Sequence, residues 1–386
     1  MFKTSLNYAL FIVLLLLGSY LSIIGGYGSD EDTLPLIGAY ESMMSGEQLM
    51  ASRFTPYPVA ELGIGFLSYN LGSAAANIIT FIFLIVSLLL FYLALVEKVN
   101  KTEFFLFLFL CLSNPILYFD NLEPMDYSWA FLPLAFGAFT LKKNFLEFAV
   151  VLFGIAIGTR IYFLVFVFII IFFFNYKISI DFKRKLLLFI LSWFIGGLFY
   201  LPIWFENGFA LNWLTAVTPS DQGAFGLIAR FFYKLVMSFS LLSFISIFIF
   251  LGFYYYKSKQ FKSNGVLLGL IFSNLVIFFF IPAEMSYLQP MIISFFLLMA
   301  FNIKQLYVYL VIFLNFFSWF IEIEPLKIKY LNEDKCNNVQ AISAEFDLKL
   351  KKGRYFYYLD TRDKIKCWVD VNTIRGKKIL EGKALK

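Results

Sequence analysis

The chain has 386 residues, of which 60% are hydrophobic and only 15% are charged, and its formal net charge is +6. A soluble domain usually carries about 25% charged residues, so this chain has too little polar surface for one or two soluble domains of its length. The composition excludes a cytosolic enzyme, an intrinsically disordered protein and a nucleic-acid binder, because the basic residues are dispersed among apolar runs. It indicates a polytopic membrane protein.

The sequence contains no histidine, and its cysteines are Cys111, Cys336 and Cys367. An imidazole base, a Ser-His-Asp triad, a His-ligated zinc and a His-ligated haem are therefore excluded. The cysteines form no CxxC pair, which argues against a zinc or iron–sulfur site. Any chemistry must use carboxylates, arginine, lysine, tyrosine or amides.

Continuous apolar runs predict an all-α polytopic fold with about eleven transmembrane helices, several of them short enough to require packing inside a bundle. The predicted spans are 6–24, 73–96, 104–119, 127–141, 145–157, 160–175, 186–204, 230–256, 265–282, 286–302 and 304–321.

Charge alternates between the loops that join these spans. Lysine and arginine fall in one alternate set of loops, and aspartate and glutamate concentrate in the other set. The positive-inside rule makes the basic set cytoplasmic. The N-terminus is then predicted on the cytoplasmic side of the cell membrane and the C-terminus on the extracytoplasmic side.

The first outside loop, 25–72, contains three consecutive acids at Asp30, Glu31 and Asp32. One interpretation is an N-cap, since an acid at this place favours the dipole of a following helix. The other is a general base at the membrane edge. The following stretch, Leu34 to Met50, has the helical spacing of an amphipathic helix lying on the interface.

The second outside loop has the sequence FDNLEPMDYS and supplies Asp120, Glu123 and Asp126. It is either a polar turn punctuated by Pro124 or a second carboxylate group that orients an acceptor or holds a divalent metal ion. Arg160, between two short spans, needs a carboxylate or a phosphate as its partner. Arg230 and Lys234 could form another phosphate clamp, or could simply extend to the membrane interface.

From about residue 322 the chain becomes rich in charge, which predicts a small soluble extracytoplasmic α+β segment over 322–386. The stretches 354–360 and 364–371 flank a turn and predict a β-hairpin. Cys336 and Cys367 would both lie outside, where a disulfide could persist, although two reduced thiols fit the sequence equally well.

These features resemble the GT-C glycosyltransferases, which include the protein O-mannosyltransferases and the bacterial aminoarabinose transferases. The resemblance rests on the inside N-terminus, the acidic opening of the first outside loop, the interfacial helix after it and the run SRFTPYPVAELG at 52–63. It covers most of 1–321, and its sharp motifs lie in the first loop. The stretch PAEMSYLQP at 282–290 departs from the family pattern, with Glu284 and Met285 where basic residues are expected.

The resemblance implies inverting transfer of a sugar from a polyprenyl-phosphate donor to a cell-envelope glycan, lipid or protein at the outer face of the membrane. On the matching positions, Asp30 would take the proton of the acceptor hydroxyl and Glu31 would assist or orient. Arg160, with Arg53 or Arg230, would steady the leaving phosphate, and Asp120 or Asp126 would hold the acceptor or a metal ion.

Two other functions share many of these features. A transporter or flippase of lipid-linked sugars should place ionisable residues near span centres or show broken helices. A polysaccharide polymerase would also have many spans and outside catalytic loops, with its long loops late in the chain. The acids here cluster in outside loops, and the long loop is the first, so an enzyme of the GT-C kind is favoured.

Overall fold

The computed structural model describes residues 2–24, 33–45, 56–174, 180–206, 223–257, 264–281, 285–324, 327–330, 355–359 and 366–370. The chain divides into two compact units. One comprises Asp30–Lys98 and Glu123–Thr218, and the other comprises Met1–Ser29, Val99–Leu122 and Pro219–Lys386. We call them the Arg160 unit and the terminal unit.

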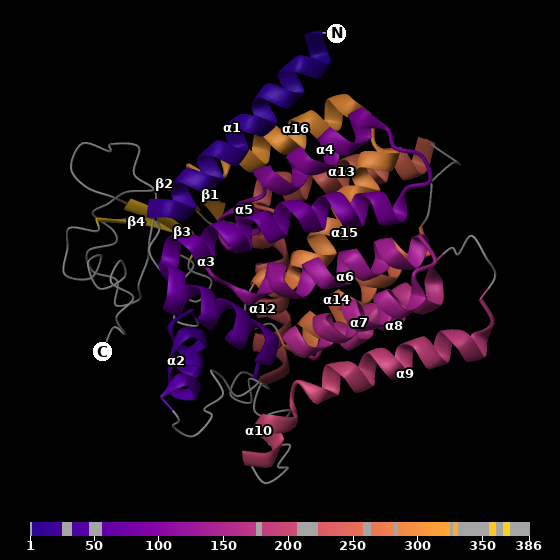
Figure 1. Ribbon diagram of the computed structural model, residues 1–386. Helices are drawn as coiled ribbons and strands as arrows, with labels where there is room; N and C mark the ends of the chain where they lie inside the picture. Colours follow the sequence, from indigo (N-terminus) through magenta and orange to yellow (C-terminus); the bar gives the residue numbers. More distant parts are fainter. Residues whose placement is uncertain are drawn as a thin grey trace. The chain divides into compact units, whose positions relative to one another are not determined.

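The described part of the Arg160 unit is helical, and its main helices lie side by side in the order α3, α6, α7, α9 (Figure 1). Its helices are α2 (Thr33–Met44), α3 (Pro58–Leu95), α6 (Asp126–Lys142), α7 (Leu146–Thr159), α8 (Phe163–Phe173), α9 (Phe182–Leu198) and α10 (Leu201–Glu206).

Glycines let α7 and α9 approach closely. A Cβ atom on Gly154 would lie 2.4 Å from Cγ2 of Ile195, and one on Gly196 would lie 2.6 Å from Cγ2 of Ile157. Inside a membrane, van der Waals contact of this kind drives helix association, because lipid removes the hydrophobic gain. The GIAIG stretch at 154–158 therefore specifies the α7–α9 pair.

Helix α3 is bent at Gly72, whose φ of 80° and ψ of 176° are not helical. Trp129 of α6 lies against both halves of α3. Its Nε1 donates to Oγ1 of Thr80 at 3.0 Å, and a Cβ atom on Gly63 would lie 2.2 Å from its Cζ3. The sequence analysis placed 58–72 in the first outside loop and began the next span at residue 73, whereas the helix begins at Pro58. These residues form the first half of α3, because Pro58 begins a helix whose buried face packs on α2 and α6.

The terminal unit contains α1, the helices α4 and α5, and the helices that follow residue 222. Its helices are α1 (Phe2–Ile24), α4 (Lys101–Ser113), α5 (Pro115–Phe119), α12 (Gly223–Ser238), α13 (Leu241–Lys257), α14 (Gly265–Phe280), the 3₁₀ turn η1 (Met285–Leu288), α15 (Gln289–Asn302) and α16 (Gln305–Phe317).

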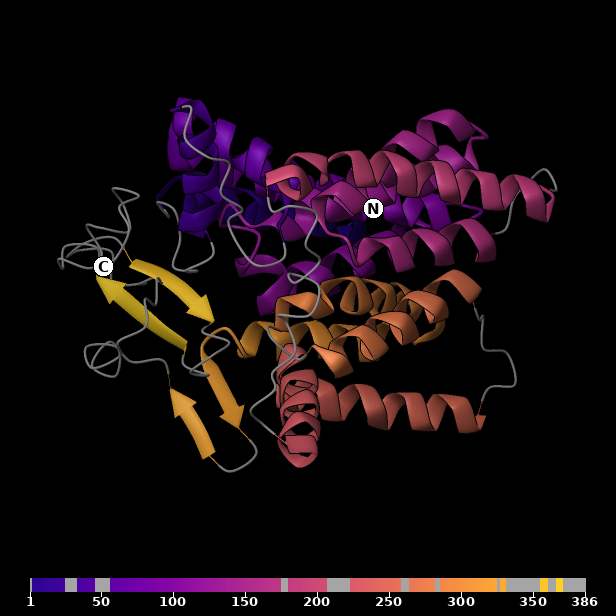
Figure 2. The same ribbon diagram turned by 90° about the horizontal axis from the view of Figure 1, so that it is seen from below.

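Two of the predicted single spans are broken in this unit. The predicted span 104–119 divides at Asn114, which caps α5 by accepting from the backbone N–H of Leu117 at 3.1 Å. The predicted span 230–256 divides between α12 and α13, which meet at 86° (Figure 2). Ser240 at this corner has a φ of 62°, a left-handed conformation that ends the helix.

Two helices in the described residues, Pro58–Leu95 and Met285–Asn302, are long and apolar enough to cross a membrane, and the bent pair α12–α13 would make a third. Five shorter apolar helices accompany them. The helical membrane architecture is as predicted, whereas the count of eleven spans stays a prediction.

The described part of the tail contains two antiparallel strand pairs. β3 (Tyr355–Leu359) pairs with β4 (Lys366–Asp370), which confirms the predicted hairpin arrangement. β1 (Ile321–Glu324) pairs with β2 (Lys327–Tyr330), and the sequence analysis missed this pair. Cys367 of β4 lies opposite Tyr358 of β3. Cys336 lies outside the described residues, so the disulfide between the two cysteines stays a prediction.

Candidate functional site

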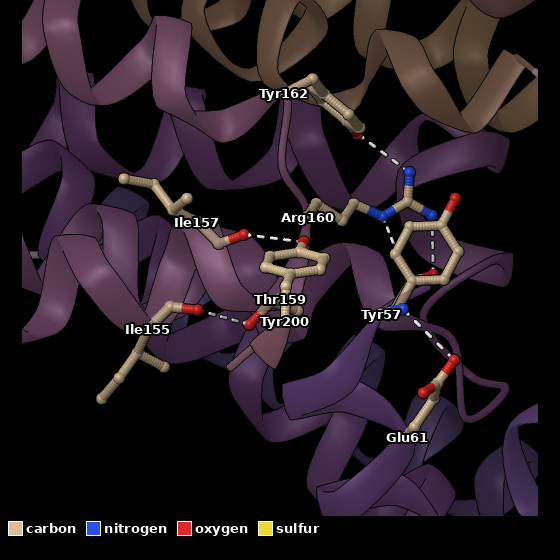
Figure 3. A network of polar contacts seen from close by, with 9 residues as sticks. Tyr57, Glu61, Ile155, Ile157, Thr159, Arg160, Tyr162 and Tyr200 are labelled. Atoms are coloured by element: carbon tan, nitrogen blue, oxygen red, sulfur yellow. Dashed lines mark hydrogen bonds and ion pairs between the residues drawn. The ribbon is translucent and has the colours of Figure 1, made fainter. Parts of the chain in front are cut away.

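A buried ion pair lies where the first turns of α3 and α6 meet the turn between α7 and α8. Its members are Arg160 and Asp126, whose side chains are both fully buried. Figure 3 shows the Arg160 guanidinium between Tyr162 and Tyr57. All these residues belong to the Arg160 unit.

The two charges meet in a bidentate geometry. Nε of Arg160 donates to Oδ2 of Asp126, and Nη2 donates to Oδ1 at 2.7 Å. Nη1 donates to the hydroxyl of Tyr162 at 2.9 Å. Parallel N–H···O bonds between a guanidinium and a carboxylate are among the strongest in proteins, and they fix the orientation of both groups.

Aromatic rings surround the same guanidinium. Its Cζ lies 3.7 Å from the centroid of the Tyr127 ring, 4.9 Å from that of Tyr57 and 5.6 Å from that of Tyr162. Ring faces attract a cation and replace some of the water that burial removes. The charge of Arg160 is therefore balanced by the Asp126 carboxylate and is further stabilised by three tyrosine rings.

Helix ends place both charges favourably. Asp126 opens α6, where the helix dipole favours an anion, and Arg160 caps the C-terminus of α7 in an extended conformation, where the dipole favours a cation. The backbone N–H of Arg160 still donates to the carbonyl of Ala156 at 3.0 Å, which ties the turn to α7.

Two neighbouring helix ends complete the site. The backbone N–H of Tyr57, at the N-cap of α3, donates to Oε1 of the buried Glu61 at 3.2 Å. The hydroxyl of Tyr200, at the end of α9, donates to the carbonyl of Ile157 at 3.1 Å (Figure 3). The ends of α3, α6, α7 and α9 therefore lie around Arg160.

The structure unites two of the residues singled out in the sequence. Arg160 was predicted to need a carboxylate or a phosphate, and it has Asp126. Asp126, predicted to hold an acceptor or a metal ion, is the carboxylate partner of Arg160 in this arrangement.

Two of the other predicted residues, Asp120 and Arg230, belong to the terminal unit. Asp120 follows α5 in the terminal unit and accepts a hydrogen bond from the Ser286 hydroxyl. Arg230 is a partly exposed residue of α12. Asp30, Glu31 and Arg53 lie outside the described residues.

No three acidic or cysteine side chains gather as a metal-ligand set within the part of the chain that the structure describes. Since Asp126 is held by Arg160, it does not offer a metal two unengaged carboxylate oxygens. A divalent metal ion at Asp120 stays a prediction.

The sequence analysis missed the aromatic residues and Glu61. A signal was present, because a tyrosine stands beside each charge of the site: Tyr127 follows Asp126, Tyr162 follows Arg160 by two, and Tyr57 precedes Glu61 by four. Spacing alone could not show that segments far apart in the chain converge.

The fold resembles that of a known membrane enzyme. The crystal structure of ArnT from Cupriavidus metallidurans bound to undecaprenyl phosphate superposes with a TM-score of 0.56 at 13% sequence identity. The match covers 77% of this chain and 60% of the ArnT chain. No family model and no curated protein sequence matches the chain. The GT-C-like fold implied by the first-loop motifs is thus confirmed, at the level of the fold.

Proposed function

We propose that this protein is a membrane glycosyltransferase that takes a sugar from a polyprenyl-phosphate donor and transfers it to a cell-envelope glycan, lipid or protein. The transfer would invert the anomeric centre and take place at the outer face of the cell membrane, with the N-terminus inside and the C-terminus outside.

The observation that carries this proposal is the similarity of the fold to an ArnT structure that holds undecaprenyl phosphate. The chain spans 60% of that structure, so the donor lipid is carried over as a hypothesis and not as a property of the shared fold. The acidic first loop, where the sequence resembles the GT-C enzymes, supplies independent support.

The proposed chemistry needs one base and one cation. Asp30 would remove the proton of the acceptor hydroxyl while Glu31 orients it, because a carboxylate within hydrogen-bond reach can act as a general base. A guanidinium would offset the charge that develops on the leaving phosphate. Arg53, Arg160 and Arg230 are the candidates for that cation.

Arg160 differs from the other two in its surroundings. Its charge is balanced by Asp126, so a direct phosphate contact would add a further anion to a site that already holds the buried carboxylates of Asp126 and Glu61. We propose that the pair serves the reaction first by holding the ends of α3, α6, α7 and α8 in place, and that either Arg53 or Arg230 meets the phosphate.

A transfer assay on membranes that contain the protein tests the function. Membranes containing the wild-type protein or Asp30→Asn receive a radiolabelled polyprenyl-phosphate sugar. We expect label in an envelope acceptor with the wild type and at least about a hundredfold less with Asp30→Asn, since a general base contributes about 10²–10⁴-fold. Equal transfer by both would overturn the role of Asp30, and the absence of transfer from every donor would overturn the function.

One observation favours the second candidate, a transporter or flippase of lipid-linked sugars. The bent pair α12–α13 is a broken helix of the kind that forms substrate sites in transporters. Movement of an intact fluorescent polyprenyl-phosphate sugar across vesicles, without cleavage of its phosphate–sugar bond, would favour this candidate over the enzyme.

A further inference from the structure

Two buried amide side chains meet in the terminal unit, at the end of α5 and the start of α15. Asn121 is fully buried and Gln289 is 4% exposed. Nδ2 of Asn121 donates to Oε1 of Gln289 at 3.3 Å. Each amide retains one unused polar atom. Among the residues that the structure describes, Oδ1 of Asn121 and Nε2 of Gln289 have no hydrogen-bond partner.

The orientation of both amides is determined by their contacts. Nδ2 of Asn121 also donates to the carbonyl of Leu117 at 2.8 Å, so its other atom must be the oxygen. Gln289 turns its oxygen toward that same Nδ2, so its nitrogen is the atom left over. The pair therefore presents one acceptor and one donor, and not two of the same kind.

The two segments that carry the amides are held firmly. Asn114 caps α5 and also donates to the carbonyl of Ser238 at 2.9 Å. Asn274 of α14 donates to the carbonyl of Tyr287 at 3.0 Å and accepts from the backbone N–H of Met291 at 3.1 Å, on either side of Gln289. Such support keeps the amides from turning to find other partners.

A group that both donates and accepts would satisfy both atoms together. A hydroxyl group does this through one O–H and two lone pairs, whereas a phosphate oxygen or an ammonium offers only half of the match. The half-buried Asp120 directly precedes Asn121 in the sequence. It accepts a hydrogen bond from the hydroxyl of Ser286, which lies three residues before Gln289. Carboxylate and amide groups side by side suit a ring that bears several hydroxyls.

We propose that Asn121 and Gln289 form a subsite for a hydroxyl group of a sugar ring, with Asp120 as a neighbouring carboxylate. This inference rests on the proposed function, because it assigns the subsite to a sugar of the donor or of the acceptor. A bound water could satisfy the same two atoms, and the experiment separates it from a sugar.

Binding is measured on the full-length protein in lipid nanodiscs by saturation-transfer NMR. One panel contains methyl glycosides of hexoses and pentoses, which mimic an acceptor, and the other contains citronellyl-phosphate monosaccharides, which mimic a donor. We expect at least one ring to bind the wild type and to bind Gln289→Leu about tenfold more weakly, with the responsive panel naming the source. The loss follows because a site built to bond a hydroxyl discriminates against its absence.

Deoxy analogues of the best ligand locate the contact. Removing one ring hydroxyl should weaken binding to the wild type about tenfold and should cost nothing further in Gln289→Leu, as expected when both changes remove one interaction. Gln289→Met keeps the length of the side chain but has no donor, so it should show the same loss if Gln289→Leu fails to fold.

Asn315→Leu is the matched control. Asn315 is fully buried and donates to the Ser113 hydroxyl at 3.2 Å. Within the described residues its Oδ1 also has no hydrogen-bond partner, but its side chain is not paired with a second amide. Its loss should leave ring binding unchanged. Equal binding by the wild type and both Gln289 variants, or binding of no ring from either panel, would overturn the subsite and leave a water in its place.

The subsite and the proposed function can be contradicted independently, because ring binding is measured without turnover. A chain that binds rings through Gln289 but transfers no sugar contradicts the function and retains the subsite. If the protein transfers sugar but its ring binding does not depend on Gln289, the function is retained and the subsite is contradicted.

Discussion

The guanidinium of Arg160 and the carboxylate of Asp126 form a bidentate, fully buried ion pair across 34 positions of the sequence. The pair joins the C-terminus of α7 to the N-terminus of α6. Because both charges have left water, each depends on the other, and the fold of the Arg160 unit should be sensitive to the loss of either one.

Asp126→Asn should destabilise the protein by about 3–5 kcal/mol, because it leaves the Arg160 charge buried without its counter-ion. Thermal unfolding of the purified protein in detergent measures this loss. Glu97→Gln is the control, since it makes the same chemical change at an exposed carboxylate and should change the stability by less than about 0.5 kcal/mol. Equal melting of the two variants would show that the pair contributes nothing to stability.

The double variant Arg160→Met/Asp126→Leu should be more stable than either single variant by about 2 kcal/mol or more, because removing both partners of a buried pair leaves no unbalanced charge. Its transfer activity then separates the two roles of Arg160. A stable double variant that keeps the donor KM of the wild type would indicate a positioning role, and one whose donor KM rises tenfold would indicate contact with the phosphate.

Gly72→Ala should destabilise the protein by about 1–3 kcal/mol, because a φ of 80° with a ψ of 176° is open essentially to glycine alone. Gly197→Ala is the matched control. Gly197 lies in α9, and beyond its own helix backbone no atom of the described residues lies within 4 Å of an added Cβ, so alanine should be neutral there or stabilising by up to about 1 kcal/mol. Equal melting temperatures for the two variants would contradict the bend in α3.

Cysteine labelling tests the predicted orientation. A membrane-impermeant maleimide applied to intact cells after mild reduction should label Cys367, which the tail is expected to carry outside. Cys111 should stay unlabelled until the protein is denatured, because it is buried in α4. Labelling of Cys367 only after the membrane is opened would place the tail inside.

The sequence predicts the helical elements well because continuous apolar runs mark them directly. It misses the breaks at Asn114 and Ser240 and the early start of α3, since a capped or bent helix keeps the same composition as a straight one. Charge in a nearly uncharged membrane segment marks Arg160 and Asp126 as residues that need partners. Their pairing with each other depends on the packing of α6 on α7, and no local sequence pattern predicts that packing.

The tyrosines and the amide pair are harder still to predict. Tyr57, Tyr127 and Tyr162 resemble any aromatic residues of an apolar chain until the fold gathers them around one cation. Asn121 and Gln289 are separated by 168 positions, and their unpartnered atoms appear only when both are buried.

Transfer from a labelled polyprenyl-phosphate sugar tests the central claim most directly. Purified wild-type protein in nanodiscs is given donors of several sugars together with an envelope extract, and the release of polyprenyl phosphate is followed alongside the label in the acceptor. We expect equal amounts of both products with one donor, and at least about a hundredfold less of each with Asp30→Asn. Release of no polyprenyl phosphate from any donor, with the lipid-linked sugar moving intact across the bilayer, would contradict the account.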